Sequence, residues 1–156
     1  MTEILIKREK TVAFSGHRSL GKDFNKLALC NEIIRLIETG YDTFLVGMAV
    51  GFDTECFKIL EKIRKKYPIK IIACIPCREQ DKNFLTYQKR EYQRMVKSAD
   101  EKIVLQEEYD KYCMLKRNDF LVDNASVLIA YLRKNQGGTE YTVRRAKKKG
   151  IKIINI

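Results

Sequence analysis

The sequence lacks the features of secreted and membrane proteins. Its 156 residues include no tryptophan, two prolines and one histidine. No apolar run approaches the roughly 20 residues that a membrane-spanning helix needs. Met1–Lys10 is charged and has no apolar stretch of the kind found in a signal peptide. We therefore expect a cytoplasmic protein that has no membrane partner.

The cysteines do not have the pattern of a disulfide framework. There are five of them, an odd number, and most stand in apolar segments, where reduced core cysteines are common. Cys74 and Cys77 have the C-x-x-C spacing of redox and zinc motifs, but no second cysteine pair follows them. Cys74 also belongs to a predicted strand. We therefore predict no metal site and no redox function for this pair.

The one unusual bulk property is the net charge of +11. A positive surface attracts polyanions and anionic small molecules. Cations near the carboxyl end of a helix, however, complement the helix dipole without any ligand. Both a functional basic face and a solvated surface remain open, because much of the charge stands where helices are expected to end. The two clusters are Lys62, Arg64, Lys65 and Lys66, and Arg144, Arg145, Lys147, Lys148 and Lys149.

Short apolar runs alternate with longer amphipathic segments along the chain. Strands separated by helices of this length imply right-handed crossovers and parallel pairing. The sequence thus predicts one α/β domain over residues 1–156, a doubly wound, mainly parallel Rossmann-like sheet with helices on both faces. The predicted strands are residues 11–15, 43–46, 69–75, 102–105, 126–132 and 152–156. The predicted helices are residues 24–38, a segment capped by Asp53 that ends before Pro68, and residues 84–98, 111–123 and 139–149.

Three glycine-containing loops follow predicted strands and form the candidate site. They are Ser15–Arg18, Gly47–Asp53 and Asn135–Thr139. In a doubly wound sheet, ligands bind beyond the carboxyl ends of the strands, where the strand order reverses. Glycines let the backbone approach a ligand, and helix N-termini offer free N–H groups to a phosphate. The loops therefore predict a phosphate site, although none has the G-x-G-x-x-G pattern of dinucleotide-binding folds.

Several residues of these loops have both a functional and a structural interpretation. Gly16 allows a tight turn, and Arg18 offers a fork-shaped donor suited to phosphate or carboxylate. His17, as the lone histidine, is more often a hydrogen-bonding or packing residue than a catalytic base. Asp53 is either a helix N-cap or a hydrogen-bonding partner of a ribose or base.

The predicted helix 111–123 carries two further candidates. Its charge run, residues 116–119, is typical of a solvated helix face, but Arg117 and Asn118 can equally point over the site. The predicted ligand-binding residues are Ser15, Gly16, His17, Arg18, Gly47, Met48, Ala49, Gly51, Asp53, Arg117, Asn118, Gly137, Gly138, Thr139 and Thr142.

With these segments in place, nearly the whole chain resembles the YpsA-like branch of the SLOG superfamily. That group includes the LOG cytokinin-activating phosphoribohydrolases and the Rossmann core of the DNA-processing protein DprA. The motifs that carry the resemblance are Ser15–Arg18, Gly47–Asp53, Met114–Asn118 followed by Asn124, and Gly137–Thr139 with Thr142. The resemblance implies a Rossmann-like fold with a pocket for a nucleotide-derived molecule. It also maps the phosphate loop of the family onto Gly137, Gly138 and Thr139 and implies a homo-oligomer.

One departure from the LOG pattern bears on catalysis. LOG hydrolases carry a P-G-G-x-G-T-x-x-E segment whose glutamate helps to break the N-glycosidic bond. Here the segment Gly137–Arg144 has an arginine where that glutamate would fall. Glycosidic cleavage passes through an oxocarbenium-like state, which a carboxylate stabilises and a guanidinium does not. The departure therefore weakens the hydrolase interpretation.

The leading hypothesis is a module that senses or sequesters a nucleotide-derived phosphate ligand, such as ADP-ribose, NAD or a cyclic ADP-ribose-type signal. It requires no cofactor. The alternative is an N-glycosidase or phosphoribohydrolase acting on a nucleoside monophosphate or NAD-like substrate, with Glu140 or Asp53 as the carboxylate. A third hypothesis is DprA-like nucleic-acid binding, motivated by the net charge of +11. The lack of tryptophan and of an aromatic stacking platform ranks it last.

Overall fold

The computed structural model describes residues 5–156 and shows strands and helices alternating as the sequence predicts. A 3-10 turn (Arg8–Lys10) precedes the first strand. The strands are β1 (Thr11–Gly16), β2 (Thr43–Val46), β3 (Lys70–Ile75), β4 (Glu101–Val104), β5 (Val127–Tyr131) and β6 (Lys152–Asn155). The helices are α1 (Lys26–Glu38), α2 (Phe52–Arg64), α3 (Thr86–Ser98), α4 (Cys113–Asp123) and α5 (Gly138–Lys149).

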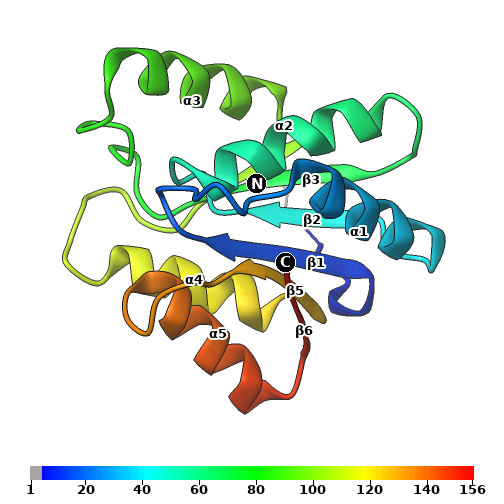
Figure 1. The fold of residues 1–156 in the computed structure, drawn as a ribbon. Coiled ribbons are helices and arrows are strands. Elements are labelled where there is room, and N and C mark those ends of the chain that lie inside the picture. The colour runs from blue at the N-terminus through cyan, green and yellow to red at the C-terminus, as the bar shows by residue number, and fades with distance from the viewer. Residues whose placement is uncertain (1–4) are drawn as a thin grey trace.

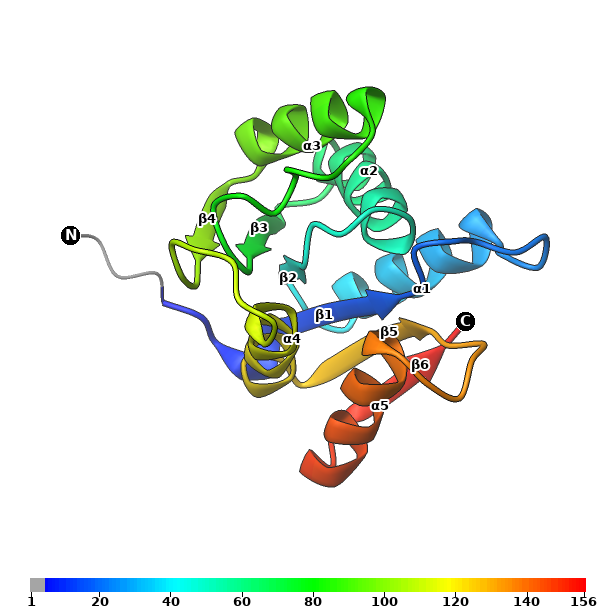
Figure 2. The same ribbon diagram turned by 90° about the vertical axis from the view of Figure 1, so that its left-hand side faces the viewer.

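The strands form a six-stranded sheet in the order β4-β3-β2-β1-β5-β6. Every neighbouring pair is parallel, so the predicted mainly parallel sheet is parallel throughout. Figure 2 shows this order from β4 at one edge to β6 at the other. The order reverses between β1 and β5, where Ala13 lies opposite Leu128. This is the place where a doubly wound sheet opens a ligand crevice.

Helices cover both faces of the sheet, as predicted (Figure 1). On β1, Val12 and Phe14 belong to the core under α1, α2 and α3, whereas Ala13 belongs to the core under α4 and α5. This alternation follows from the two-residue period of a strand. Because both faces of the central strands are buried, their sequences are almost entirely apolar.

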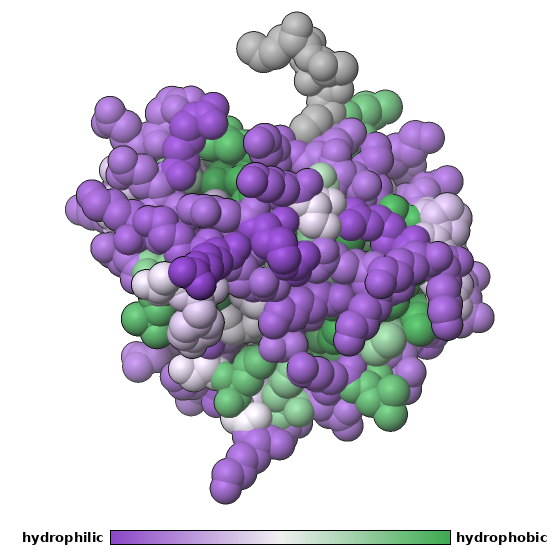
Figure 3. Space-filling view, turned by 90° about the horizontal axis from the view of Figure 1, so that it is seen from above, coloured by the Kyte–Doolittle hydropathy of each residue, from purple (hydrophilic) through white to green (hydrophobic). Residues whose placement is uncertain are grey.

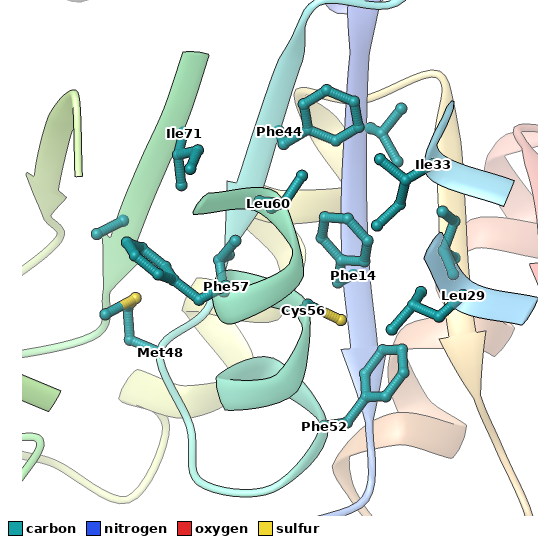
Figure 4. Packing of buried hydrophobic residues seen from close by; sticks show 14 of the residues in the cluster. Phe14, Leu29, Ile33, Phe44, Met48, Phe52, Cys56, Phe57, Leu60 and Ile71 are labelled. Atoms are coloured by element: carbon teal, nitrogen blue, oxygen red, sulfur yellow. The ribbon is translucent and has the colours of Figure 1, made fainter. Parts of the chain in front are cut away.

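Helix α2 is held to the sheet by residues spaced four apart. Phe52, Cys56 and Leu60 are fully buried, and they point toward Phe14 and its neighbours (Figure 4). Burying a side chain such as Leu or Phe contributes about 1.5–3 kcal/mol. The apolar stripe therefore fixes the position of α2, and with it the loop that leads into the helix.

Helix boundaries differ slightly from the predicted ones. Helix α1 begins at Lys26 rather than at residue 24, because Asn25 is its N-cap and its Oδ1 accepts the N–H of Ala28 at 3.0 Å. The prediction that Asp53 caps α2 is wrong. Gly51 occupies the N-cap position, without a side-chain hydrogen bond, and Asp53 lies in the first turn.

Within residues 5–156, all five cysteines are free thiols, and four of them are buried. Burial raises the pKa of Cys74 to about 12. No helix in this part of the chain is both long enough and apolar enough to cross a membrane.

Candidate ligand-binding site

A cavity of about 490 Å³ lies beyond the carboxyl ends of β1 and β5, at the reversal of strand order. We call it the sheet-end cavity. All three predicted loops and helix α4 contribute to its walls. The predicted residues that line it are Ser15, Gly16, His17, Arg18, Ala49, Asp53, Arg117, Asn118, Gly137, Gly138 and Thr139. The structure thus brings together residues that are more than 100 positions apart in the sequence.

The other predicted residues lie outside this cavity. Met48 and Gly51 line a second cavity, between α2 and α3. Thr142 is fully buried and donates its hydroxyl hydrogen to the Gly138 carbonyl at 2.7 Å. Glu140 pairs with the exposed Arg144 one turn along α5, at 3.0 Å. Glu140, a predicted catalytic candidate, is not among the residues that line the sheet-end cavity.

Arg117 on α4 holds the loop after β2 in place by a hydrogen bond to its backbone. Its side chain is 5% exposed, and its Nη1 donates to the Gly47 carbonyl. Its Nε donates to Asn118 Oδ1 at 2.9 Å. Gln80 Nε2 donates to the same Gly47 carbonyl at 3.0 Å. Arg117 thus lines the cavity but directs two of its donors at protein atoms.

Gly47 itself has no room for a side chain. A Cβ at this position would lie 2.9 Å from Arg117 Cζ and 3.0 Å from Asp53 Oδ2. The two buried charges therefore flank the same glycine. This close approach explains why the residue that follows β2 is a glycine.

Asp53 is buried, with 6% exposure, and lines the sheet-end cavity. Its Oδ2 accepts the backbone N–H of Ala49 at 3.1 Å. Its Oδ1 is buried without a hydrogen-bond partner among the described residues. Burial raises the pKa of Asp53 to about 6, against the opposing charge of Arg117. A buried, unpaired carboxylate oxygen at a cavity wall is suited to accept a ligand hydroxyl or amine.

The loops after β1 and β2 touch backbone to backbone. Gly51 has φ +86°, and a Cβ there would lie 2.1 Å from the Arg18 carbonyl oxygen. The N–H of Phe52 donates to the His17 carbonyl at 3.2 Å. Gly16 is required for space rather than for the predicted tight turn, because a Cβ there would lie 2.3 Å from the Phe52 ring.

His17 has the hydrogen-bonding role expected of a lone histidine. Its Nε2 accepts the backbone N–H of Arg133, in the loop after β5, at 2.8 Å. The ring is therefore neutral with its proton on Nδ1, and Nε2 is not available as a general base. Burial, together with the charges of Lys134 and Arg133, lowers the pKa of His17.

The loop after β5 ends in an uncapped helix. Gly137 is the N-cap of α5, with φ +104° and no side-chain hydrogen bond. The first N–H groups of α5 are therefore open to an anion. Two exposed cations, Arg18 and Lys134, line the same cavity. Neither has a hydrogen bond or ion pair from its side chain to any residue in 5–156.

The family model YpsA (YspA SLOG family) matches residues 14–154, almost the whole of the chain. The chain belongs to the YpsA SLOG family.

This YpsA-family chain is 35% identical over 136 residues to the SPbeta prophage-derived protein YoqJ of Bacillus subtilis strain 168, and the match covers 78% of each chain. It is 24% identical over 128 residues to the UPF0398 protein YpsA of the same strain, covering 80% of this chain and 71% of that protein. Both matches agree with the resemblance found in the sequence motifs.

Among solved structures, DprA of Streptococcus pneumoniae has the same fold, with a TM-score of 0.66 at 20% identity. The match covers 93% of the YpsA-family chain and 49% of DprA, so the chain spans about half the length of DprA. At this level of identity the likeness shows the fold alone.

Several lining residues of the YpsA-family cavity were missed by sequence reasoning. Lys134 and Gln136 precede the double glycine, and Met114 lies one turn before Arg117 on α4. They could have been predicted from the sequence, because each lies on the same loop or the same helix as a predicted ligand-binding residue. The other lining residues that were missed are Phe14, Ser19, Leu115 and Leu121.

Ion pairs account for part of the basic cluster at the end of α5. Arg145 contacts Asp123 at 3.0 Å and Asp119 at 3.2 Å, both on α4, and Lys149 contacts Asp123 at 2.9 Å. These contacts join the two helices on one face of the sheet. They support the structural interpretation of this cluster in the YpsA-family protein over a polyanion-binding one.

Proposed function

We propose that this protein binds a nucleotide-derived phosphate ligand, such as ADP-ribose, NAD or a cyclic ADP-ribose-type signal, in the sheet-end cavity. It senses or sequesters the ligand without turning it over. The observation that carries the proposal is the uncapped N-terminus of α5, which opens on the cavity beside Arg18 and Lys134. Free N–H groups and unpaired cations together favour a phosphate.

The other walls are consistent with a ribose phosphate. The volume of about 490 Å³ falls within the range of about 300–1,000 Å³ typical of small-molecule sites. Asp53 offers an unpaired acceptor for a hydroxyl group. The lining therefore combines donors for phosphate with an acceptor for sugar. The proposal gives Arg117 and His17 positioning roles, because both hold loops that form the walls.

The test is calorimetric titration of the protein with ADP-ribose, NAD, cyclic ADP-ribose isomers and mononucleotides. Arg18→Ala and Lys134→Ala should each weaken binding by roughly 10- to 100-fold, because charge-assisted hydrogen bonds are worth about 1.5–3 kcal/mol. Arg144→Ala removes an exposed arginine of α5 outside the cavity and should leave affinity unchanged. Failure of all phosphate-bearing ligands to bind at millimolar concentration would overturn the proposal.

One observation favours a second candidate, an N-glycosidase. Asp53 is the one acidic residue among the described residues that line the cavity, and its Oδ1 is free. A carboxylate there is suited to stabilise an oxocarbenium-like state. Chromatography of incubations with AMP or NAD should then detect released base. Asp53→Asn should abolish the release, and Glu140→Gln should not. Binding without any release would exclude this candidate and leave the first.

A further inference from the structure

A second cavity, of about 430 Å³, lies between α2 and α3 on the other side of the loop after β2. We call it the α2–α3 pocket. Its apolar and aromatic lining residues are Leu20, Met48, Val50, Phe84, Tyr87, Tyr92 and Met95. Both helices lie on the face of the sheet that carries α1, seen from above in Figure 3. Hydrophilic side chains cover most of that face, and hydrophobic ones appear as separate small areas.

The aromatic residues of this pocket are of two kinds: Tyr92 is buried at its base, and Tyr87 is exposed at its edge. Tyr92 is 6% exposed, and its ring meets Phe84 edge to face, with 5.6 Å between the ring centroids. Met48 and Met95 are also buried. Tyr87 is 68% exposed and forms no aromatic pair among the described residues. An exposed ring at the edge of a partly apolar pocket is suited to stack on a planar group.

Arg18 joins this pocket to the sheet-end cavity. It lines both cavities, and its backbone carbonyl lies against Gly51, at the mouth of the α2–α3 pocket. The two cavities therefore adjoin at the exposed Arg18, on either side of the backbone contact between the loops after β1 and β2. The two cavities together offer room for one elongated ligand with chemically different ends.

The charges of the α2–α3 pocket favour a neutral occupant over a second phosphate. Its lining carries two cations, Arg18 and Lys58, and two carboxylates, Glu55 and Glu91, which pair with Lys26 and Arg94 outside the pocket. Helix α2 begins at its wall with the uncapped Gly51, but the first turn of α2 carries two acidic residues, Asp53 and Glu55, which oppose an anion. The pocket therefore combines rings and thioethers, from Phe84, Tyr87, Tyr92, Met48 and Met95, with a balanced set of charges at its walls.

We propose that the α2–α3 pocket binds the planar, nucleobase-type end of the ligand whose phosphate occupies the sheet-end cavity, with Tyr87 stacking on the base. This inference rests on the proposed function, because it assigns the base of the same ligand. It adds a specificity site, in which the base distinguishes one phosphate-bearing ligand from another.

The test compares AMP with ribose 5-phosphate, two ligands that differ by the base. Tyr87→Ala should weaken AMP binding roughly 5- to 150-fold, the equivalent of about 1–3 kcal/mol of stacking, and leave ribose 5-phosphate binding unchanged. Tyr87→Phe should keep wild-type affinity for AMP. Tyr109→Ala is the matched control, because Tyr109 is 65% exposed and lines neither cavity.

A fluorescence readout is independent of affinity. The chain has no tryptophan, so Tyr87→Trp places a single reporter in the pocket. AMP should quench its emission and ribose 5-phosphate should not. The emission of the Tyr109→Trp variant should respond to neither ligand.

The outcomes separate the two proposals. If ribose 5-phosphate binds but AMP binds no more tightly, or if Tyr87→Ala affects both ligands equally, the inference is wrong and the proposed function stands. If neither ligand, nor any other phosphate-bearing molecule, binds the wild-type protein, both fail.

Discussion

The imidazole Nε2 of His17 accepts the backbone N–H of Arg133 at 2.8 Å and so joins the loop after β1 to the loop after β5. These loops flank the reversal of strand order and form opposite walls of the sheet-end cavity. A protonated ring would offer a donor where an acceptor is needed. The shape of the cavity is therefore linked to the protonation state of one histidine.

The first prediction concerns the pH dependence of stability. Burial lowers the pKa of His17 below its ordinary value of 6.5. As the pH falls below about 6.5, the unfolded chain takes up this proton before the folded protein does, so the free energy of unfolding falls. Urea unfolding of the wild type and of His17→Gln between pH 5 and 8 measures the effect. The fall in the free energy of unfolding that is due to His17 should be absent from the variant. Identical pH profiles for the wild type and the variant would contradict the prediction.

The second prediction concerns Gly51. Alanine there should lower the free energy of unfolding by about 2–4 kcal/mol, because it combines an unfavourable φ with a clash against the Arg18 carbonyl. Gly40→Ala is the matched control, since Gly40 has φ +113° but no atom within 4 Å of the position that a Cβ would occupy. It should cost about 1–2 kcal/mol from the backbone alone. Equal losses for the two variants would show that the contact with Arg18 is unimportant.

The third prediction concerns Arg117. Arg117→Met removes the donor to the Gly47 carbonyl and the cation that most strongly opposes the burial of the Asp53 carboxylate. The free energy of unfolding should fall by about 3–5 kcal/mol. Arg117→Lys keeps the charge but not the two-point geometry, so its loss should be smaller. Arg144→Met breaks an exposed pair and should cost less than about 1 kcal/mol.

The fourth prediction concerns the cysteines. Burial raises the pKa of Cys56 and Cys74, which keeps both thiols protonated at neutral pH. Cys30 is the one cysteine of the described residues that is partly exposed. Titration with a disulfide reagent should therefore find about one reactive thiol in the native protein and five after denaturation. Rapid reaction of Cys74 or Cys77 would contradict the prediction that this pair has no redox function.

The fold was predictable because its signals are local and repeated. A strand such as β5 is apolar at every position since both of its faces are buried, and helices such as α1 show the 3.6-residue period of a single buried face. Asp53 shows the limit of local reasoning. A capping residue before an apolar run predicts an N-cap, but Gly51 takes that position because the tight contact with Arg18 needs a glycine there.

The candidate site was predictable as a set of loops but not as a set of contacts. The carboxyl ends of parallel strands lie at the same edge of a sheet, so the three glycine loops that follow them had to lie near one another. The direction of Arg117 had a signal in its spacing, four residues after Cys113 and four before Leu121, which places all three on the buried side of α4. The α2–α3 pocket had no such signal in the sequence, because it depends on how two separate helices lie against each other.

The last prediction concerns Asp53 and has the opposite sign to that of His17. The pKa of Asp53 in the folded protein is about 6, against an ordinary value of 3.8. Between these values the folded protein keeps a proton that the unfolded chain has released. The free energy of unfolding therefore falls as the pH rises through this interval, by about 3 kcal/mol in full.

Unfolding of the wild type and Asp53→Asn between pH 4 and 8 isolates this contribution. The variant should gain stability relative to the wild type as the pH rises from about 4 to about 6, and the difference should be constant above pH 7. Loss of the Ala49 contact shifts the variant by a constant amount and does not alter this slope. A difference that does not change with pH would mean that Asp53 titrates normally, and that its Oδ1 is solvated rather than held free for a ligand.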